Sequence, residues 1–279
     1  MLKDYAYAKI NLALEVLDEI EDGYHIVNNL MVPIDLKDEI TVEKDKEIVI
    51  DDDPFKGHNL IEKAAKAFFE YTGIKGGCRF TVKKNIPEAA GLAGGSSDCA
   101  CAIRLLDKLY NTNLDLFELK KIAESLGSDV PFFIESKLAL CKHRGERVFP
   151  YNINYKKYRI LLIKPSSGLE TKEVYKRYKY TSKKREESIN SIIDGLENDD
   201  VSKIKKFIFN DLGRTAATLN KELKTIFNAL RDNDIRVFIS GSGPTMYLFD
   251  PSDEEIDKVG NILNNVNINN IFILETKIA

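Results

Sequence analysis

A segment of small residues from Ile86 to Ser97, with the sequence IPEAAGLAGGSS, precedes a run of apolar residues at helical spacing. Small side chains let backbone N–H groups approach an anion closely, and the first turn of a helix adds unpaired donors and the positive end of its dipole. The segment is therefore a candidate phosphate-binding loop. It matches neither the P-loop pattern nor G-x-G-x-x-G. The alternative is a tight turn with a helix cap at Ser96 or Ser97.

A second glycine cluster, SGSGPT at 240–245, lies between two short apolar segments. By itself this pattern is more typical of a hairpin loop than of a ligand site. Its significance depends on whether it accompanies the first loop.

Together, the two glycine clusters resemble motifs of the GHMP kinases, a family of small-molecule kinases. Residues 87–97 resemble the central phosphate-binding motif of that family, and residues 240–244 resemble its C-terminal glycine motif. The resemblance implies an α+β, two-domain GHMP kinase fold, with a ribosomal-protein-S5-domain-2-like ATP-binding domain at residues 1–150 and a GHMP substrate domain at residues 151–279. It assigns ATP binding to Pro87, Ala90, Gly91, Leu92, Ala93, Gly94, Gly95, Ser96 and Ser97.

Further segments are similar to one branch of this family, whose acceptor is the C2 hydroxyl of 4-diphosphocytidyl-2-C-methyl-D-erythritol in the non-mevalonate route to isoprenoids and terpenoids. They are AKINL at 8–12, DGYH at 22–25, LGSDVPFF at 126–133 and RGE at 144–146. With them, the resemblance covers nearly the whole chain. It implies that ATP donates its γ-phosphoryl group to this hydroxyl, giving the 2-phosphate and ADP.

Phosphoryl transfer to a hydroxyl needs a group that orients or deprotonates the acceptor and a cation that holds the developing charge. The resemblance assigns these roles to Asp129 and Lys9. Without the flanking motifs, Asp129 would be interpreted as a turn residue before a proline, and Lys9 as an exposed lysine of a strand. We also expect Mg²⁺, because the transferring phosphates need charge neutralisation, with Ser97 a weak candidate ligand.

A cytidine base is recognised by hydrogen bonds to its edge and by stacking on a flat side chain. The resemblance places His25 at the cytosine edge with Tyr24 nearby, and Tyr175 stacked on the ring. Tyr175 alone would more often be a half-buried aromatic residue of the core. The expected substrate contacts are Asn11, Tyr24, His25, Tyr175, Gly241 and Ser242.

Several positions depart from the family pattern. Ala89, Ala90 and Ala93 stand where glycines are more usual, and alanine permits close approach to an anion unless the backbone requires a positive φ. His143 stands where glycine is frequent, and Gly213 where an acidic residue is common.

The elements that position these residues can be read from periodicity. Residues 5–17 alternate after Ala8 as a strand, which puts Lys9 and Asn11 on one face, and Asp22-Gly23 marks a turn. We expect helices at 59–71, 97–110, 116–126, 188–196, 201–207 and 219–228, and strands at 28–36, 39–43, 79–83, 158–163, 237–240, 246–249 and 271–276. The segment at 128–133 is expected not to continue as a helix through Pro131. Whether the last strand returns to the first domain stays open.

Composition narrows the function classes. The chain has 279 residues, 43% hydrophobic and 30% charged, with a formal net charge of −3, so no basic field attracts nucleic acid. The four cysteines form no metal or disulfide pattern and are typical of buried thiols, and the N-terminus lacks an apolar leader. We expect a cytoplasmic monomer or weak homodimer that acts on a small molecule and binds neither nucleic acid nor membrane.

Three other functions remain possible at this point. The chain could be another GHMP kinase that acts on homoserine or mevalonate, although such acceptors have no base for His25 to contact. It could be a silent member that binds nucleotide as a regulatory module, which intact Lys9 and Asp129 disfavour. It could also be a structural or nucleic-acid-associated protein whose glycine loops are only turns, but the expected basic patch is missing.

Overall fold

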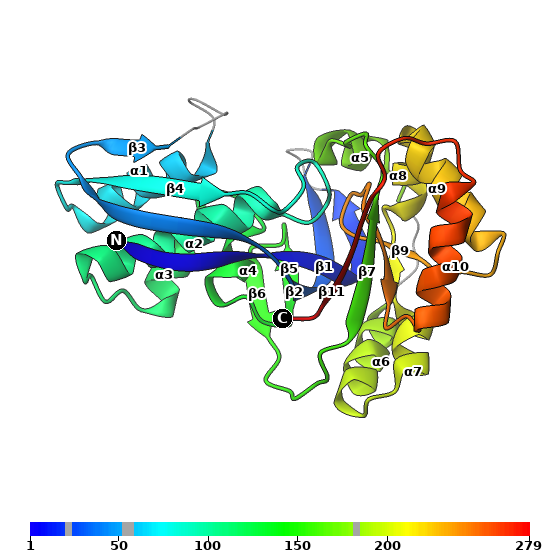
Figure 1. Cartoon of the computed structure of the whole chain (residues 1–279). Helices are drawn as coiled ribbons and strands as arrows, with labels where there is room; N and C mark the ends of the chain where they lie inside the picture. The colour runs from blue at the N-terminus through cyan, green and yellow to red at the C-terminus, as the bar shows by residue number, and fades with distance from the viewer. Residues whose placement is uncertain (20–23, 52–58, 181–184) are drawn as a thin grey trace.

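The computed structural model describes residues 1–19, 24–51, 59–180 and 185–279, so the predicted turn at Asp22-Gly23 lies outside the described residues. A seven-stranded sheet occupies the N-terminal half (Figure 1). Its main path is β3-β4-β2-β1-β8, with β5 paired to both β2 and β6. The strands are β1 (Leu2–Glu19), β2 (His25–Asp45), β3 (Ile48–Ile50), β4 (Gly77–Lys83), β5 (Ala139–His143), β6 (Arg147–Pro150) and β8 (Phe209–Asn210).

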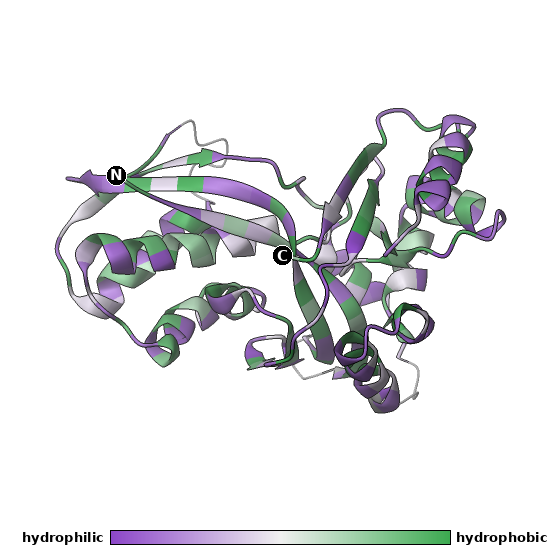
Figure 2. Cartoon of the chain, turned by 60° about the horizontal axis from the view of Figure 1, so that its bottom comes forward, coloured by the Kyte–Doolittle hydropathy of each residue, from purple (hydrophilic) through white to green (hydrophobic). Residues whose placement is uncertain are grey.

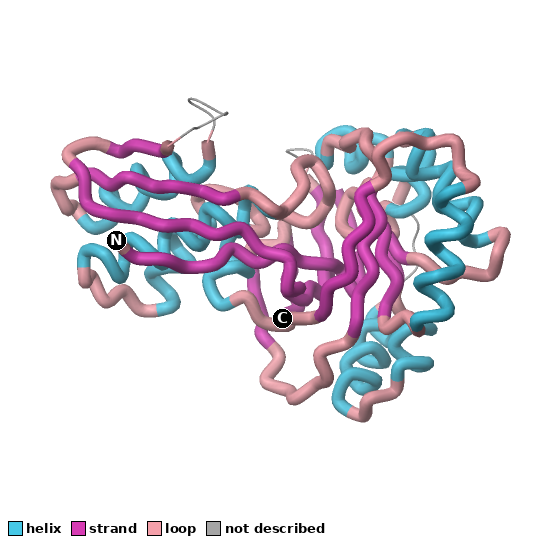
Figure 3. The backbone as a smooth tube through the Cα atoms, in the orientation of Figure 1, coloured by secondary structure: helices cyan, strands magenta, loops and turns pink. Residues whose placement is uncertain are grey.

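A second sheet of four strands has the order β11-β7-β10-β9. Its strands are β7 (Arg159–Lys164), β9 (Phe238–Ile239), β10 (Met246–Phe249) and β11 (Phe272–Lys277). The last strand, β11, belongs to the second sheet, and the residues after it reach the first sheet. β11 pairs with β7 in the second sheet, but the backbone N–H of Ala279 then donates to the carbonyl of Pro33 on β2, 3.0 Å away. The C-terminus therefore lies between the two halves (Figures 1 and 3).

Four helices cover one face of the first sheet: α1 (Leu60–Thr72), α2 (Gly94–Tyr110), α3 (Leu116–Glu124) and α4 (Val130–Glu135). Local signals set their ends. The side chain of Asn59 accepts a hydrogen bond from the backbone of Ile61 at the start of α1, and Gly73 ends that helix with a φ of 69°. A capping box formed by Asp115 and Glu118 begins α3.

The C-terminal half contains the other described helices. They are α5 (Thr171–Arg177), α6 (Glu186–Glu197), α7 (Val201–Phe207), α8 (Gly213–Leu219), α9 (Lys221–Arg231) and α10 (Asp253–Asn264). Figure 2 shows hydrophobic and hydrophilic residues interleaved along these helices, as expected for helices that bury one side. No helix among the described residues is long and apolar enough to cross a bilayer.

Three clusters of buried side chains form the core. One lies between the first sheet and α1–α4, and another between the second sheet and helices that include α9 and α10. The third joins the two halves, because Ile10 and Leu12 of β1 share it with Tyr158 and Tyr247. Burial of this shared cluster stabilises one relative placement of the two halves. The expected boundary near residue 150 falls in the irregular segment between β6 and β7.

Most predicted helices and strands are present, and two local predictions are wrong. The segment after Gly127 does form a helix, α4, because Pro131 sits in its first turn, where the missing N–H is not needed. Helix α2 begins at Gly94 and not at Ser97, with Ala93 as its N-cap, so Ser96 and Ser97 lie inside the first turn and do not cap it. Helices α5, α8 and α10 were not predicted.

Candidate active site

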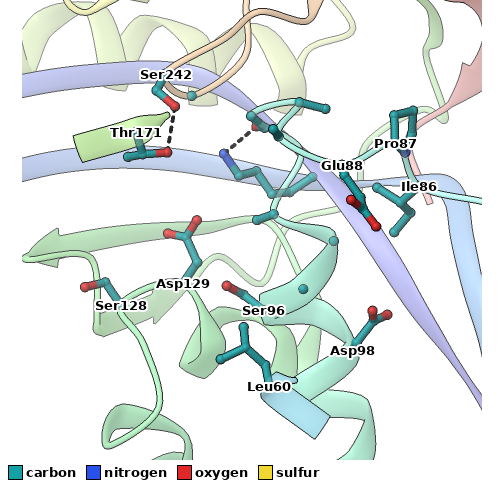
Figure 4. A pocket seen from close by; sticks show the side chains of 18 of the residues that line it. Leu60, Ile86, Pro87, Glu88, Ser96, Asp98, Ser128, Asp129, Thr171 and Ser242 are labelled. Atoms are coloured by element: carbon teal, nitrogen blue, oxygen red, sulfur yellow. Dashed lines mark hydrogen bonds between the residues drawn. The ribbon is translucent and has the colours of Figure 1, made fainter. Parts of the chain in front are cut away.

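A cavity of about 1350 Å³ lies between the phosphate loop, the middle of β1, the start of β2, the starts of α1, α2 and α4, and helix α5. Figure 4 shows part of its lining. It brings together residues that lie far apart in the sequence. The predicted site residues that line it are Lys9, Asn11, Tyr24, His25, Pro87, Ala90, Gly91, Ala93, Gly94, Gly95, Ser96, Asp129, Tyr175, Gly241 and Ser242.

Two predicted ATP-binding residues are not among the described lining residues. The side chain of Leu92 is buried in the shared core, and its carbonyl accepts a hydrogen bond from the backbone N–H of Lys9, 3.2 Å away. Ser97 is buried in the first turn of α2, and its backbone N–H donates to the carbonyl of Ala93. The predicted contacts of Leu92 and Ser97 with ATP stay untested.

The phosphate loop is held by the C-terminal half of the chain. Its carbonyls at positions 89, 90 and 91 accept hydrogen bonds from Leu169 N (3.4 Å), Thr245 N (3.3 Å) and Ser240 Oγ (3.0 Å), respectively. The 240–245 segment, between the paired strands β9 and β10, is thus a hairpin loop that also contacts the first glycine cluster. The first N–H groups of α2 have no acceptor within the helix, which leaves them directed at the cavity. This is the arrangement of an anion site.

Two of the three alanines in this loop do adopt positive φ. Ala89 has a φ of 46° and Ala93 a φ of 56°, a region that costs an L-residue roughly 1–2 kcal/mol. The backbone therefore does require a positive φ at Ala89 and Ala93, where glycine would be less strained than alanine. His143 likewise has a φ of 64°, which explains why glycine is suitable there, and Gly213 begins α8.

Lys9 is buried, with only 3% of its surface exposed. Its ammonium donates to Asn11 Oδ1 at 2.7 Å and to the carbonyl of Gly91 at 3.0 Å. Burial lowers the pKa of this ammonium, and the negative charge of Asp129 opposes that shift. Lys9 thus places a cation between the phosphate loop and the start of α4.

Asp129 immediately precedes α4. Its carboxylate caps none of the described N–H groups of that helix, and Figure 4 shows it directed into the cavity. The buried ammonium of Lys9 and this carboxylate interact through their opposite charges. The pair can therefore orient a hydroxyl group and offset charge on a transferring phosphoryl group.

The orientation of Asn11 is set by residues that the sequence did not identify. Asn11 Nδ2 donates to Asn29 Oδ1 at 2.5 Å, and the hydroxyl of Tyr247 donates to the carbonyl of Asn11 at 2.7 Å. Because Asn29 accepts from the amide nitrogen, the amide oxygen of Asn11 faces Lys9. Asn29 also lines the cavity.

We expect Asn29→Leu to lower kcat by about tenfold, the equivalent of one net hydrogen bond, because Asn11 would lose the acceptor that fixes its amide. The measurement is kcat with both substrates saturating. Asn29→Asp keeps an acceptor oxygen at the same position and serves as the control. Equal kcat values for the leucine variant and the wild type would contradict this positioning role.

Aromatic rings form the other end of the cavity. The ring centroids of His25 and Tyr175 are 5.1 Å apart with a 41° tilt, and His25 meets Tyr178 edge-on at 6.2 Å. Burial raises the pKa of the Tyr175 phenol, so this hydroxyl stays protonated. The guanidinium of Arg144 lies 4.6 Å from the ring centroid of Tyr24. A flat base fits this environment.

Sequence reasoning missed Tyr178 and the role of Arg144 in this cavity. Tyr178 follows Tyr175 by three residues at the end of α5, a spacing that puts two side chains on one side of a helical turn. Arg144 belonged to the RGE segment, but only the fold shows that the turn between β5 and β6 reaches the aromatic end of the cavity. Thr171, which shares a 2.8 Å hydrogen bond with Ser242, was also missed (Figure 4).

Family comparisons agree with this geometry. The GHMP kinases N terminal domain matches residues 59–137, and the GHMP kinases C terminal domain matches residues 192–269. A 4-diphosphocytidyl-2-C-methyl-D-erythritol kinase of Clostridium botulinum is 38% identical over 252 residues, covering 88% of this chain and 90% of that protein. The chain belongs to this family of GHMP kinases. The corresponding protein of Clostridium beijerinckii is 39% identical over 256 residues, covering 89% of this chain and 91% of that protein.

Solved structures of GHMP kinases share the fold. A crystal structure of 4-(cytidine 5'-diphospho)-2C-methyl-D-erythritol kinase superposes over the full length of both chains, with a TM-score of 0.79 and 29% identity. Homoserine kinase from Cytophaga hutchinsonii covers 99% of this chain and 94% of its own, with a TM-score of 0.72 at 17% identity, which shows the fold alone. The chain is thus a small-molecule kinase of the GHMP type that uses ATP.

Proposed function

We propose that this kinase transfers the γ-phosphoryl group of ATP to the C2 hydroxyl of 4-diphosphocytidyl-2-C-methyl-D-erythritol, giving the 2-phosphate and ADP. The observation that carries the proposal is that one cavity contains a phosphate loop at one end and the rings of Tyr175 and Tyr178 against His25 at the other, with Lys9 and Asp129 between them. This arrangement fits an acceptor whose base lies at the His25 end of the cavity and whose reactive hydroxyl lies beside Lys9 and Asp129.

Each part of the cavity has a proposed role. The loop and the first turn of α2 hold the phosphates of ATP through backbone N–H groups. Asp129 orients the acceptor hydroxyl and takes its proton, while Lys9 offsets the charge on the transferring group. His25 contacts the cytosine edge, Tyr175 stacks on the ring, and Gly241, Ser242, Asn11 and Tyr24 contact the acceptor.

Mg²⁺ is part of the proposal, because it neutralises the charge of the transferring phosphates. No cluster of three or more His, Cys, Asp or Glu side chains suited to a metal exists among the described residues. The ion would therefore depend largely on oxygens of ATP. The buried hydroxyl of Ser97 has no hydrogen-bond partner among the described residues, so it is still a candidate.

The proposed setting is the cytoplasm, with the enzyme acting as a monomer or weak homodimer that needs neither nucleic acid nor membrane. The four cysteines are free and buried, and burial raises the pKa of Cys78, Cys99 and Cys101 to about 12. Such thiols are inert and suit a reducing compartment.

The test is an ADP-release assay with ATP, Mg²⁺ and one acceptor at a time. We expect turnover with 4-diphosphocytidyl-2-C-methyl-D-erythritol, and none with homoserine or mevalonate, because neither acceptor has a base for the His25 end of the cavity. Turnover with either control and none with the cytidylyl compound would refute the proposed acceptor. ATP binding without turnover on any acceptor would favour a silent nucleotide-binding protein.

A further inference from the structure

A buried carboxylate on β2 lies beside the start of the phosphate loop. Asp38 has no exposed surface, and its Oδ1 accepts hydrogen bonds from the backbone N–H groups of Asn85 (2.5 Å) and Ile86 (2.8 Å). Its Oδ2 accepts a third, from Lys84 Nζ at 2.5 Å. Asp38 itself is not among the described residues that line the cavity, so it acts on the loop only through its neighbours.

Lys84 makes a second ion pair, across the loop. Its ammonium also donates to Asp98 Oδ2 at 2.6 Å, and Asp98 lies on the second turn of α2, just beyond the loop. The segment before the loop and the helix after it are therefore joined through one ammonium group. Lys84 and Asp98 both line the cavity.

We propose that Asp38, Lys84 and Asp98 form a clasp that holds the two ends of the phosphate loop together and thereby strengthens ATP binding. The proposal rests on the use of ATP by the proposed function, but not on the identity of the acceptor. A loop whose donors are already in place loses less conformational entropy when the phosphates bind. Asp38 and Asp98 are therefore positioning residues for the donor nucleotide.

The charges of the clasp give it a distinctive pH dependence. Burial raises the pKa of the Asp98 carboxyl to about 7, with Lys84 opposing the shift and Asp38 adding to it. The thiols of Cys99 and Cys101 on the same helix stay neutral in this range. As the pH falls below about 7, Asp98 takes up a proton and loses its ion pair with Lys84. The clasp should then weaken.

The first experiment measures the dissociation constant of ATP by calorimetry, without acceptor, for the whole protein. In Asp38→Asn an amide NH₂ group can face the Lys84 ammonium in place of an oxygen, so we expect about tenfold weaker ATP binding. Binding of cytidine 5'-diphosphate should change less than twofold. The control is Asp35→Asn, which also removes a carboxylate from β2. Among the described ion pairs, this carboxylate pairs only with Lys37. The control should leave both dissociation constants unchanged.

The second experiment compares the wild type with Asp98→Asn, which is nearly isosteric, between pH 6 and pH 8. The ratio of the two ATP dissociation constants in each buffer removes the ionisation of ATP itself. We expect wild-type binding to tighten relative to the variant as the pH rises through 7. The opposite slope would mean that repulsion between Asp98 and the triphosphate dominates, and would overturn the clasp.

The outcomes separate the two proposals. A wild-type protein that binds ATP, with Asp38→Asn binding it equally well, would overturn the clasp and leave the proposed kinase activity standing. Equal losses of ATP and cytidine 5'-diphosphate binding with a lowered Tm would show a general structural role and would also overturn it. A wild-type protein that binds no ATP would refute the proposed function.

Discussion

Replacing Asp129 by asparagine is expected to lower kcat by about a thousandfold, within the range for a group that moves or orients a proton in the transition state. The amide keeps the shape of the carboxylate but can neither accept the proton of the acceptor hydroxyl nor pair with the charge of Lys9. Because the carboxylate caps none of the described N–H groups of α4, the substitution should leave folding intact. The measurement is kcat with saturating substrates, beside the Tm and the ATP dissociation constant.

Asp232→Asn is a suitable control for this variant. Asp232 has 65% of its side chain exposed and pairs with Arg231 at the end of α9, so it should keep wild-type kinetics. If Asp129→Asn turns over at close to the wild-type rate, Asp129 has no part in the chemical step. If it loses turnover only together with a large drop in Tm, its role is structural.

Much of the fold follows from local patterns in the sequence. The alternation of residues 5–17 predicts a strand with one face on a core; the strand is present, but residues 8–16 are buried on both of its faces. The amphipathic spacing from Leu60 with its stop at Gly73 predicts α1 almost residue for residue. Local reasoning failed where a tertiary contact or a helix end overrode it. Pro131 breaks a helix interior but is favourable in a first turn, and α2 begins with glycines whose weak helix propensity is offset by the burial of the next two turns.

The candidate site could be predicted in part. Alternation alone puts Lys9 and Asn11 on one face of β1, and this face does line the cavity. Asn29 could not be predicted, because β1 and β2 shift register between Asn11 and Ala13, and such a shift depends on packing of the whole sheet. Because this register shift cannot be read from the sequence, no spacing in the sequence relates Asn29 to Asn11.

The clasp was missed for a similar reason. Asp38, Lys84 and Asp98 are separated by 46 and 14 residues along the chain, and only the antiparallel pairing of β2 with β4 brings the first two together. Charged residues in such positions are usually assigned to a solvated surface when only the sequence is known. The register of β2 against β4 brings these charged residues together, and residue type alone does not reveal that register.

A methyl group at Gly91 is expected to weaken ATP binding by more than a hundredfold and to lower the free energy of unfolding by about 2–4 kcal/mol. The φ of Gly91 is 74°, and a Cβ there would lie 2.3 Å from the carbonyl oxygen of Ser240 and 2.9 Å from that of Gly243. Both contacts are with backbone, so one of the two glycine segments must move. The expected loss combines the cost of positive φ with that of forced displacement in a packed region.

The matched control for Gly91→Ala is Gly73→Ala. Gly73 has a similar φ of 69°, but a Cβ there meets nothing within 4 Å. It should therefore lose only the roughly 1 kcal/mol of backbone strain and keep its affinity for ATP. Chemical denaturation and calorimetry with ATP measure both quantities. If the two variants behave alike, close contact between the glycine segments is not what shapes the phosphate loop. If Gly91→Ala alone loses ATP, the loop depends on its contact with the C-terminal half, and the nucleotide site is a property of both halves of the chain.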